Sequence, residues 1–417
     1  MEGANIMVYA VGGFVLLMLI EYAYGYFKKK QLYRLNDTVT NLNIGVGSQV
    51  FGLLYKVIIY SALVVAYKNF AIFDIPINVV TILLCAVLYD FLFYWAHRWG
   101  HEVNLFWGAH IVHHQSEEYN LSVALRQPWF HQLMSFFIFL PLPIIGFDPL
   151  MILGVSLFST LFQFWIHTKA IKKMPAWYEF IFNSPAHHRV HHAVNEKYID
   201  KNHGAVLIIW DRIFGTFKAE EEEPTYGITT QFKSLNPIWS NFHYYFEIWD
   251  KMKTMNFKNK IKMVFAKPGW TPDGPAPSEL IKQVDLKREK HNPKVPLGFS
   301  VYVFVQLMII MWGVVAYMNH FDELSVFFQW FFAGLIILSM TICSGIFEKK
   351  KWVFFGEYAR ILMIAFSINT FYYLNYMDWF LAMVIFSSIA AVTFYVWFSI
   401  SLKINYKEIL LGDQVLN

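Results

Sequence analysis

The sequence predicts an all-α protein, a polytopic integral membrane helical bundle with a cytosolic, histidine-rich cap for two metals. Three observations predict this class. The 417-residue chain is 56% hydrophobic. Only 15% of its residues are charged, whereas a soluble domain carries about a quarter. The chain also contains 15 histidines, and most of them cluster in short segments that follow apolar runs of membrane-spanning length.

Four apolar runs in the first half of the chain are predicted to enter the membrane: Ile6–Tyr24, Ile44–Ala66, Ile77–Trp95 and Leu133–Ile166. The first ends in YGYFKKKQLYR without a small-residue cleavage site, so we interpret it as an anchor and not as a removable signal peptide. The fourth is long enough to enter and return. Pro141, Pro143 and the GFDP at 146–149 interrupt it, which predicts a tight re-entrant hairpin or two short spans.

Four further runs occupy the second half: Leu297–Met318, Leu324–Phe347, Ile361–Leu374 and Trp379–Ile400. Lysines follow the first, sixth and last runs, at 28–30, 349–351 and 403–407. Because cytosolic loops are enriched in lysine and arginine, the amino end is predicted outside and the carboxyl end in the cytosol. Every histidine-rich segment then falls on the cytosolic side of a bacterial inner membrane, or of the endoplasmic reticulum in a eukaryotic cell.

The chain divides into three predicted parts. Residues 1–250 contain all the clustered histidines, residues 251–295 form a basic interfacial helix and a linker, and residues 296–417 form a transmembrane region of about four spans. Both cysteines, Cys85 and Cys343, lie in apolar runs, which excludes a disulfide framework. The net charge of +4 is too small to indicate nucleic-acid binding, so the lipid bilayer is the expected partner.

Three motifs bring histidines together. HRWGH at 97–101 places two imidazoles one helical turn apart, whereas HIVHH at 110–114 and HRVHH at 188–192 each place three on one helix face. We therefore expect each motif to direct its imidazoles at a common point. Eight imidazoles exceed what one four-coordinate zinc uses, and they suit two metals with open positions. The expected ligands are His97, His101, His110, His113, His114, His188, His191 and His192.

The type of metal follows from what accompanies these histidines. Imidazole suits zinc, copper, iron and nickel. The sequence has no HExxH, no cysteine–histidine finger and no paired Glu-x-x-His motifs of ferritin-like di-iron proteins. An imidazole-rich site with open positions at a membrane surface favours redox iron and dioxygen over hydrolysis.

Other histidines adjoin the motifs. His167 ends an apolar run on the predicted cytosolic side and is expected to join the metal site. His187 immediately precedes the third motif and is expected to be a ligand or to hydrogen-bond one. His131 is interpreted as an interfacial residue, and His203 is not counted as a ligand.

Charged residues near the motifs are candidates for supporting roles. A metal-bound imidazole normally donates its other N–H to a carboxylate or a carbonyl. Asp90 lies two turns before His97 on the same helix face, and Glu102 follows the first motif, so both are candidate catalytic carboxylates that support the ligands. Arg126 and Arg189 are candidates for binding an anionic headgroup or a cofactor.

These motifs resemble the fatty acid hydroxylase and sterol desaturase superfamily of membrane di-iron enzymes. A narrower resemblance is to its branch that cleaves ether lipids with tetrahydrobiopterin. It rests on residues 97–127, QFWIHT at 163–168, residues 184–217 and YGIT at 226–229. The resemblance covers roughly residues 1–250, which identifies that part as a fatty acid hydroxylase-like membrane domain.

The resemblance implies two iron ions on the eight motif histidines, with dioxygen and tetrahydrobiopterin as further cofactors. The implied reaction hydroxylates the ether-bearing carbon of a membrane alkylglycerol, and the product collapses to a fatty aldehyde and a glycerol derivative. The chain is then expected to be an oxidoreductase, a monooxygenase of lipid metabolism. Neither the motifs nor the resemblance identifies an electron donor.

Two alternatives stay open at this point. A hydroxylase or desaturase of sterols, fatty acids or carotenoids would use the same di-iron site. A metal or haem transport protein would use histidines along a path, but transporters bind near the bilayer midplane on interrupted helices. The histidines of this chain lie just beyond the ends of the predicted spans.

Overall fold

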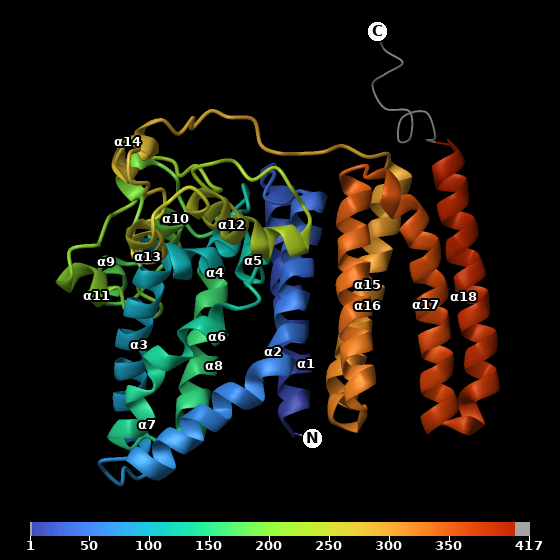
Figure 1. Ribbon diagram of the computed structural model, residues 1–417, viewed down its shortest axis with the longest axis horizontal. Helices are drawn as coiled ribbons and strands as arrows, with labels where there is room; N and C mark the ends of the chain where they lie inside the picture. Colours follow the sequence, from blue (N-terminus) through green and yellow to red (C-terminus); the bar gives the residue numbers. More distant parts are fainter. Residues whose placement is uncertain (1, 405–417) are drawn as a thin grey trace. The chain divides into compact units, whose positions relative to one another are not determined.

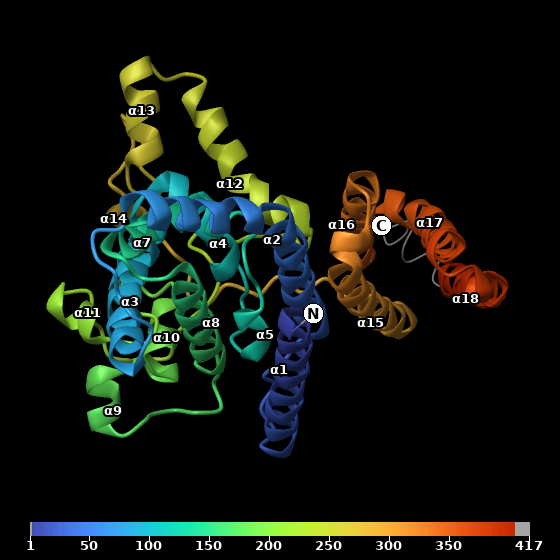
Figure 2. The ribbon, with the colours of Figure 1, turned by 90° about the horizontal axis from the view of Figure 1, so that it is seen from below.

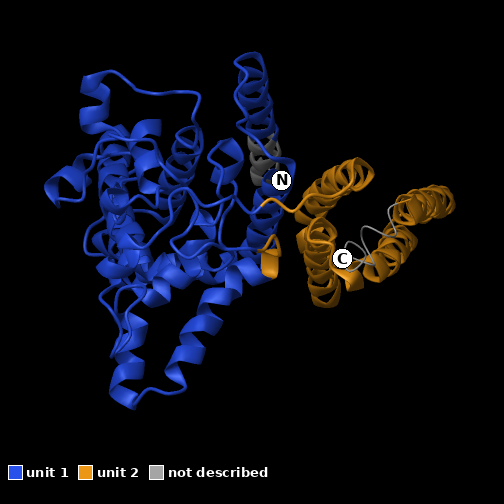
Figure 3. Ribbon diagram, turned by 90° about the horizontal axis from the view of Figure 1, so that it is seen from above, with its two compact units in different colours: residues 1–233, 239–291 blue, residues 234–238, 292–417 orange. Residues whose placement is uncertain are grey.

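A computed structural model describes residues 2–404, and side chains from residue 12 onward. The described residues form helices, and their β-structure is limited to two isolated bridges, Phe182 with Leu207 and Ala193 with Tyr226. The chain separates into two compact units (Figure 3). Unit 1 contains residues 1–233 and 239–291, and unit 2 contains residues 234–238 and 292–417. The expected all-α membrane fold is confirmed.

Unit 1 combines long helices with a layer of short ones at one end (Figure 1). The long helices and the short pieces between them are α1 (Glu2–Phe27), α2 (Leu35–Phe70), α3 (Val79–Glu102), α4 (Asn104–His114), α5 (Leu121–Ala124), α6 (His131–Ser135), η1 (Phe136–Phe139), α7 (Pro141–Ile145) and α8 (Pro149–Trp165). The end layer contains α9 (Ala176–Ile181), α10 (Pro185–His191), η2 (Glu196–Tyr198), α11 (Ile209–Ile213), α12 (Pro237–Met252), α13 (Phe257–Phe265) and α14 (Pro277–Lys282).

Within unit 1, α2 and α3 are long and apolar enough to span a membrane. After α4 and α5, the chain runs away from the end layer through the short helices α6, η1 and α7 (Figure 1). It then returns toward that layer through the 17-residue α8. The reversal occurs at Gly146, whose φ is +125° and where an added Cβ would lie 2.0 Å from the Phe73 carbonyl oxygen. Only glycine fits this turn, because both the dihedral and the contact exclude a side chain.

Unit 2 consists of α15 (Leu297–His320), η3 (Phe321–Glu323), α16 (Val326–Phe347), α17 (Lys351–Asn375) and α18 (Met377–Ile404). The helices α15, α16 and α18 are candidate spans. The prediction that the third helix begins at Ile361 was wrong, because α17 begins ten residues earlier. Glu357 and Arg360 interrupt the apolar pattern but not the helix. Both are fully buried and pair at 2.6 Å between Oε1 and Nη2, which removes the cost of an isolated charge.

The helix α4 is positioned by packing on one face and by a hydrogen-bonded start. Ile111 and Val112 are buried in a core cluster with Ile44 of α2 and Met263 of α13. At the start of α4, the Asn104 side chain donates to the Met263 carbonyl at 2.8 Å. Since the apolar face is used for packing, the histidines of α4 are directed to its other side.

Candidate metal centre

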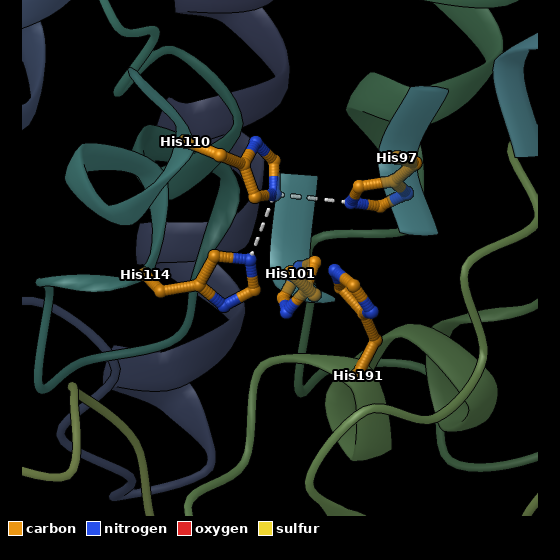
Figure 4. Close-up of side chains that lie close together, drawn as sticks. All are labelled: His97, His101, His110, His114 and His191. Atoms are coloured by element: carbon orange, nitrogen blue, oxygen red, sulfur yellow. Dashed lines mark hydrogen bonds between the residues drawn. The ribbon is translucent and has the colours of Figure 1, made fainter. Parts of the chain in front are cut away.

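Helices α3, α4 and α10, with the segment after α8, bring nine imidazoles into two adjacent groups. Within each group, one nitrogen from every ring lies within 4.8 Å of one nitrogen from every other ring. The first histidine group consists of His97, His101, His110, His114 and His191 (Figure 4). The second histidine group consists of His113, His167, His188 and His192. All nine side chains are buried.

The grouping corrects one sequence expectation. Each motif was expected to direct all of its imidazoles at one common point. Instead, His110 and His114 of α4 belong to the first group and His113 belongs to the second. The segment at α10 divides likewise, with His191 in the first group and His188 in the second. Helix positions i, i+3 and i+4 share a face but still differ in direction by tens of degrees. Two crossing helices can therefore supply two sites at once.

Nitrogen-to-nitrogen distances connect the members of each group. In the first group, His110 Nε2 lies 3.1 Å from both His97 Nε2 and His114 Nε2, and Figure 4 marks both contacts. In the second group, His167 Nε2 lies 3.2 Å from His113 Nε2 and 3.0 Å from His188 Nε2. His188 Nε2 in turn lies 3.2 Å from His192 Nε2.

The tautomers in the second group indicate what these contacts can bind. His113 Nδ1 lies 3.1 Å from the Arg126 carbonyl oxygen, and His167 Nδ1 lies 2.7 Å from the Gln163 carbonyl oxygen. A carbonyl only accepts, so both Nδ1 atoms carry the proton. Burial lowers the pKa of both rings, so each is neutral and its Nε2 presents a lone pair.

Two lone pairs that face each other repel unless a positive ion lies between them. Nitrogens bind first-row metals at about 2.1 Å, so two ligands at a right angle lie about 3.0 Å apart. The observed separations of 3.0–3.2 Å fit that spacing. In the first group, His101 Nε2 and His191 Nε2 are buried and have no hydrogen-bond partner among the described residues. These histidines therefore fit the binding of metal ions.

The acceptors that orient the imidazoles are mainly backbone carbonyls. His97 Nδ1 donates to the His203 carbonyl at 2.7 Å, and His191 Nδ1 donates to the Lys201 carbonyl at 3.0 Å. Together with the carbonyls of Arg126 and Gln163, they fix the tautomer of four rings. Sequence reasoning missed these groups, because every residue has a carbonyl and only the folded loop selects one.

The two candidate carboxylates contact other groups. Asp90 is buried in α3 and accepts hydrogen bonds from Val206 N at 2.9 Å, Leu207 N at 3.0 Å and Trp210 Nε1 at 3.0 Å. It thereby holds the loop that presents the His203 carbonyl to His97. Among the described residues, Glu102 pairs with Arg98 at 3.3 Å and Lys267 at 3.9 Å and contacts no imidazole.

The guanidinium groups of Arg126 and Arg189 bind protein acceptors. Arg126 donates to the Val112 carbonyl at 2.6 Å and to Gln115 Oε1 at 2.6 Å, which holds the end of α4. Arg189 forms an ion pair with Glu220 at 2.6 Å and donates to the Thr168 carbonyl at 3.0 Å, next to His167.

Three more histidines lie near the groups. His187 belongs to neither, and its ring packs 5.4 Å from that of Phe217. The His131 ring lies 5.2 Å from that of His110. His203 is fully buried, its ring lies 5.1 Å from that of His101, and neither ring nitrogen has a hydrogen-bond partner in the described part of the chain. Its spacing gave no signal, since His203 reaches the site only through the path of its loop.

Acid is expected to destabilise the metal-free protein. Burial lowers the pKa of His113 from 6.5 to about 4, and lowers the pKa of His188 and His192 well below 6.5. Between these values the unfolded chain binds more protons than the folded chain. Stability is therefore full above pH 6.5 and decreases as the pH falls, by up to ~1.4 kcal/mol per histidine and pH unit. Melting curves at about pH 7.5 and about pH 5.5 test this, and an unchanged melting temperature would contradict it.

Comparisons with known proteins agree with the site. A family model described as "Fatty acid hydroxylase" matches residues 82–216, which contain every histidine of both groups. The alkylglycerol monooxygenase of Homo sapiens is 36% identical over 84% of this chain and 79% of its own length. That of Danio rerio is 36% identical over 72% of this chain and 68% of its own length. Lathosterol oxidase of Rattus norvegicus is 28% identical over 36% of this chain and 50% of its own length. No solved structure matches.

Proposed function

Because this chain belongs to the alkylglycerol monooxygenase family, we propose that it cleaves the O-alkyl bond of alkylglycerol ether lipids. Membership makes it an oxygen-dependent lipid monooxygenase of the membrane. In the proposed reaction, one oxygen atom enters the C–H bond next to the ether oxygen and the other leaves as water. Tetrahydrobiopterin supplies the two electrons. The hemiacetal then collapses to a fatty aldehyde and a glycerol derivative.

The observation that carries the proposal is the pair of adjacent imidazole groups. The rings of His114 and His192, one from each group, stack with their centroids 4.3 Å apart. Metal ions bound in two such adjacent groups could act together on one small ligand. Donors made only of imidazole, with more nitrogens than one ion needs, support two iron ions. Iron bound there would supply the activation of dioxygen that a C–H bond requires.

The residues around the two histidine groups would shield the reaction from water. The nine imidazoles are at most 8% exposed, so water is excluded from them. The carbonyls of His203, Lys201, Arg126 and Gln163 orient the rings. We assign Asp90, Arg126 and Arg189 to positioning these segments.

The membrane setting follows from the apolar helices, and its sidedness is part of the proposal. The apolar helices make the chain an integral membrane protein. Its family makes a lipid the substrate. The lysines at 28–30 and 349–351 support placing the histidine groups on the cytosolic side. The membrane would be a bacterial inner membrane, or the endoplasmic reticulum in a eukaryotic cell. An alkylglycerol can then reach the site sideways from the bilayer.

A sterol substrate is the second candidate, and one observation favours it. Lathosterol oxidase shares the motif region with this chain, at 28% identity. The similarity covers only 36% of the chain, whereas the similarity to human alkylglycerol monooxygenase covers 84%. The longer similarity also includes segments outside the metal centre, which supports the ether lipid over the sterol.

Membranes that contain the protein are expected to release fatty aldehyde from an alkylglycerol only when both tetrahydrobiopterin and dioxygen are supplied. The measurement is aldehyde formation from a panel of an alkylglycerol, a sterol and a free fatty acid, each with and without the pterin. Membranes without the protein are the control. Oxidation of the sterol or the fatty acid with the ether left intact would contradict the proposed substrate.

A further inference from the structure

Helices α12 and α13 form a hairpin at the end of unit 1 where α4 and α10 lie (Figure 1). Figure 2 looks along the long helices of this unit and shows that the hairpin extends past α2 and α3. Beneath most of its length there is no spanning helix of this unit. If the long helices cross a bilayer, the hairpin lies over lipid.

The inner face of the hairpin is used for packing. Met263 of α13 and Tyr244 and Ile248 of α12 are buried in one cluster with Ile111 and Val112 of α4. Met263 is only 1% exposed. The inner face therefore anchors the hairpin to α4, and the outer face is not part of this core cluster.

The outer face of α13 carries a second apolar stripe. Phe257, Ile261 and Phe265 follow each other at intervals of four residues, and they are 78%, 48% and 63% exposed. On α12, Phe246 and Trp249 are exposed as well. Large apolar side chains in a row on one face indicate a surface that another apolar phase covers.

The charge pattern identifies the covering phase. The nine residues of α13 include Lys258, Lys260 and Lys262 and no acidic residue. Lys258 and Lys262 border the stripe on one side, and Lys260 lies on the other. An apolar stripe between lysines is typical of helices that lie in the headgroup region of anionic membranes. A protein partner would instead have to place acidic groups on both sides of this stripe.

We propose that the α12–α13 hairpin docks on an anionic leaflet, with its outer stripe at the boundary between headgroups and acyl chains. This contact fixes the depth of the metal centre. Asn104, the first residue of α4, donates from its backbone N to the Ala266 carbonyl at 2.9 Å and accepts from Tyr244 Oη at 2.5 Å. Both helices of the hairpin are thus tied to the helix that carries His110, His113 and His114.

Spin labels in lipid nanodiscs test this docking in the full-length chain. The native Cys85 and Cys343 are buried, so a cysteine introduced as Ile261→Cys accepts the label selectively. Lys260→Cys is the matched control, one residue away and directed off the stripe. We expect a label at Ile261 to lose access to a water-soluble nickel complex and to gain access to oxygen, relative to one at Lys260. The difference should be larger in phosphatidylglycerol discs than in phosphatidylcholine discs.

Two results would overturn the proposal. One is equal nickel access at both positions in both kinds of disc. The other is dipolar broadening between labels, which would place a second copy of the chain on the stripe. The variant Lys258→Gln with Lys260→Gln should remove the effect of phosphatidylglycerol while metal content stays constant. Because no turnover is measured, the result does not depend on the proposed substrate.

Discussion

Replacing His188 with alanine is expected to abolish turnover and to remove about one metal ion per chain. The second histidine group has four members, and His188 lies between two of them, with Nε2 3.0 Å from His167 Nε2 and 3.2 Å from His192 Nε2. Four ligands are the usual minimum for a closed site. Loss of a supporting partner alone costs about 10–100-fold in metal affinity, so loss of a ligand should cost at least ~100-fold.

The first histidine group should respond less sharply. It has five members, so His101→Ala leaves four nitrogens. This variant should retain more metal than His188→Ala at the same ion concentration. Elemental analysis of the purified chains measures the content, and aldehyde release measures turnover.

His243→Ala is the matched control, because it removes an imidazole that lies on α12 and belongs to neither histidine group. It should keep both metal content and activity. Two retained ions together with full turnover in His188→Ala would contradict the assignment of the second group.

The sequence was sufficient for most helices and for the histidines that the fold gathers into the two groups. Apolar runs at period 3.6 or of spanning length predict α2, α3 and α15, because burial in lipid demands continuous apolar surface. The helix α17 was predicted too short, since hydropathy treats Glu357 and Arg360 as separate charges. One turn of helix brings the two side chains together, and only the tertiary fold buries the pair.

The spacing of histidines predicted which residues meet but not which of them share an ion. His113 and His114 are neighbours in sequence, yet they belong to different groups. The division depends on how the fold places α4 and α10 relative to each other, and no local pattern encodes it. His167 was predicted to join the site and lies in the second group. The participation of a metal ion at these residues stays a prediction that the variants test.

The loop from residue 199 to 208 shows a further limit. It supplies the carbonyl that orients His97 and brings the His203 ring to the first group. Asp90 in α3 and Asp211 in α11 hold this loop through backbone N–H groups, with Asp211 accepting from His203 N at 2.7 Å. Asp90 was predicted to support a ligand by direct contact. Its observed contacts are with the loop, so its influence on His97 passes through the backbone.

Asp90→Asn is therefore expected to weaken metal binding at the first histidine group by about 10–100-fold and to spare the second. An asparagine presents one acceptor oxygen where the carboxylate presents two, and its NH₂ faces a donor. At least one of Val206 N, Leu207 N and Trp210 Nε1 is then buried without a partner, which costs about 1–3 kcal/mol. The loop relaxes and the His203 carbonyl leaves His97.

Competition with a chelator measures this change, because two groups of different affinity release metal in two phases. Only the phase of the first group should shift in Asp90→Asn. Glu102→Gln is the comparison on the same helix, and it should shift neither phase, since Glu102 pairs with Arg98 and Lys267. A lower melting temperature in Asp90→Asn with both phases unchanged would show that Asp90 supports only the fold. A shift in the phase of the second group would show that the loop orients more than His97 and His191.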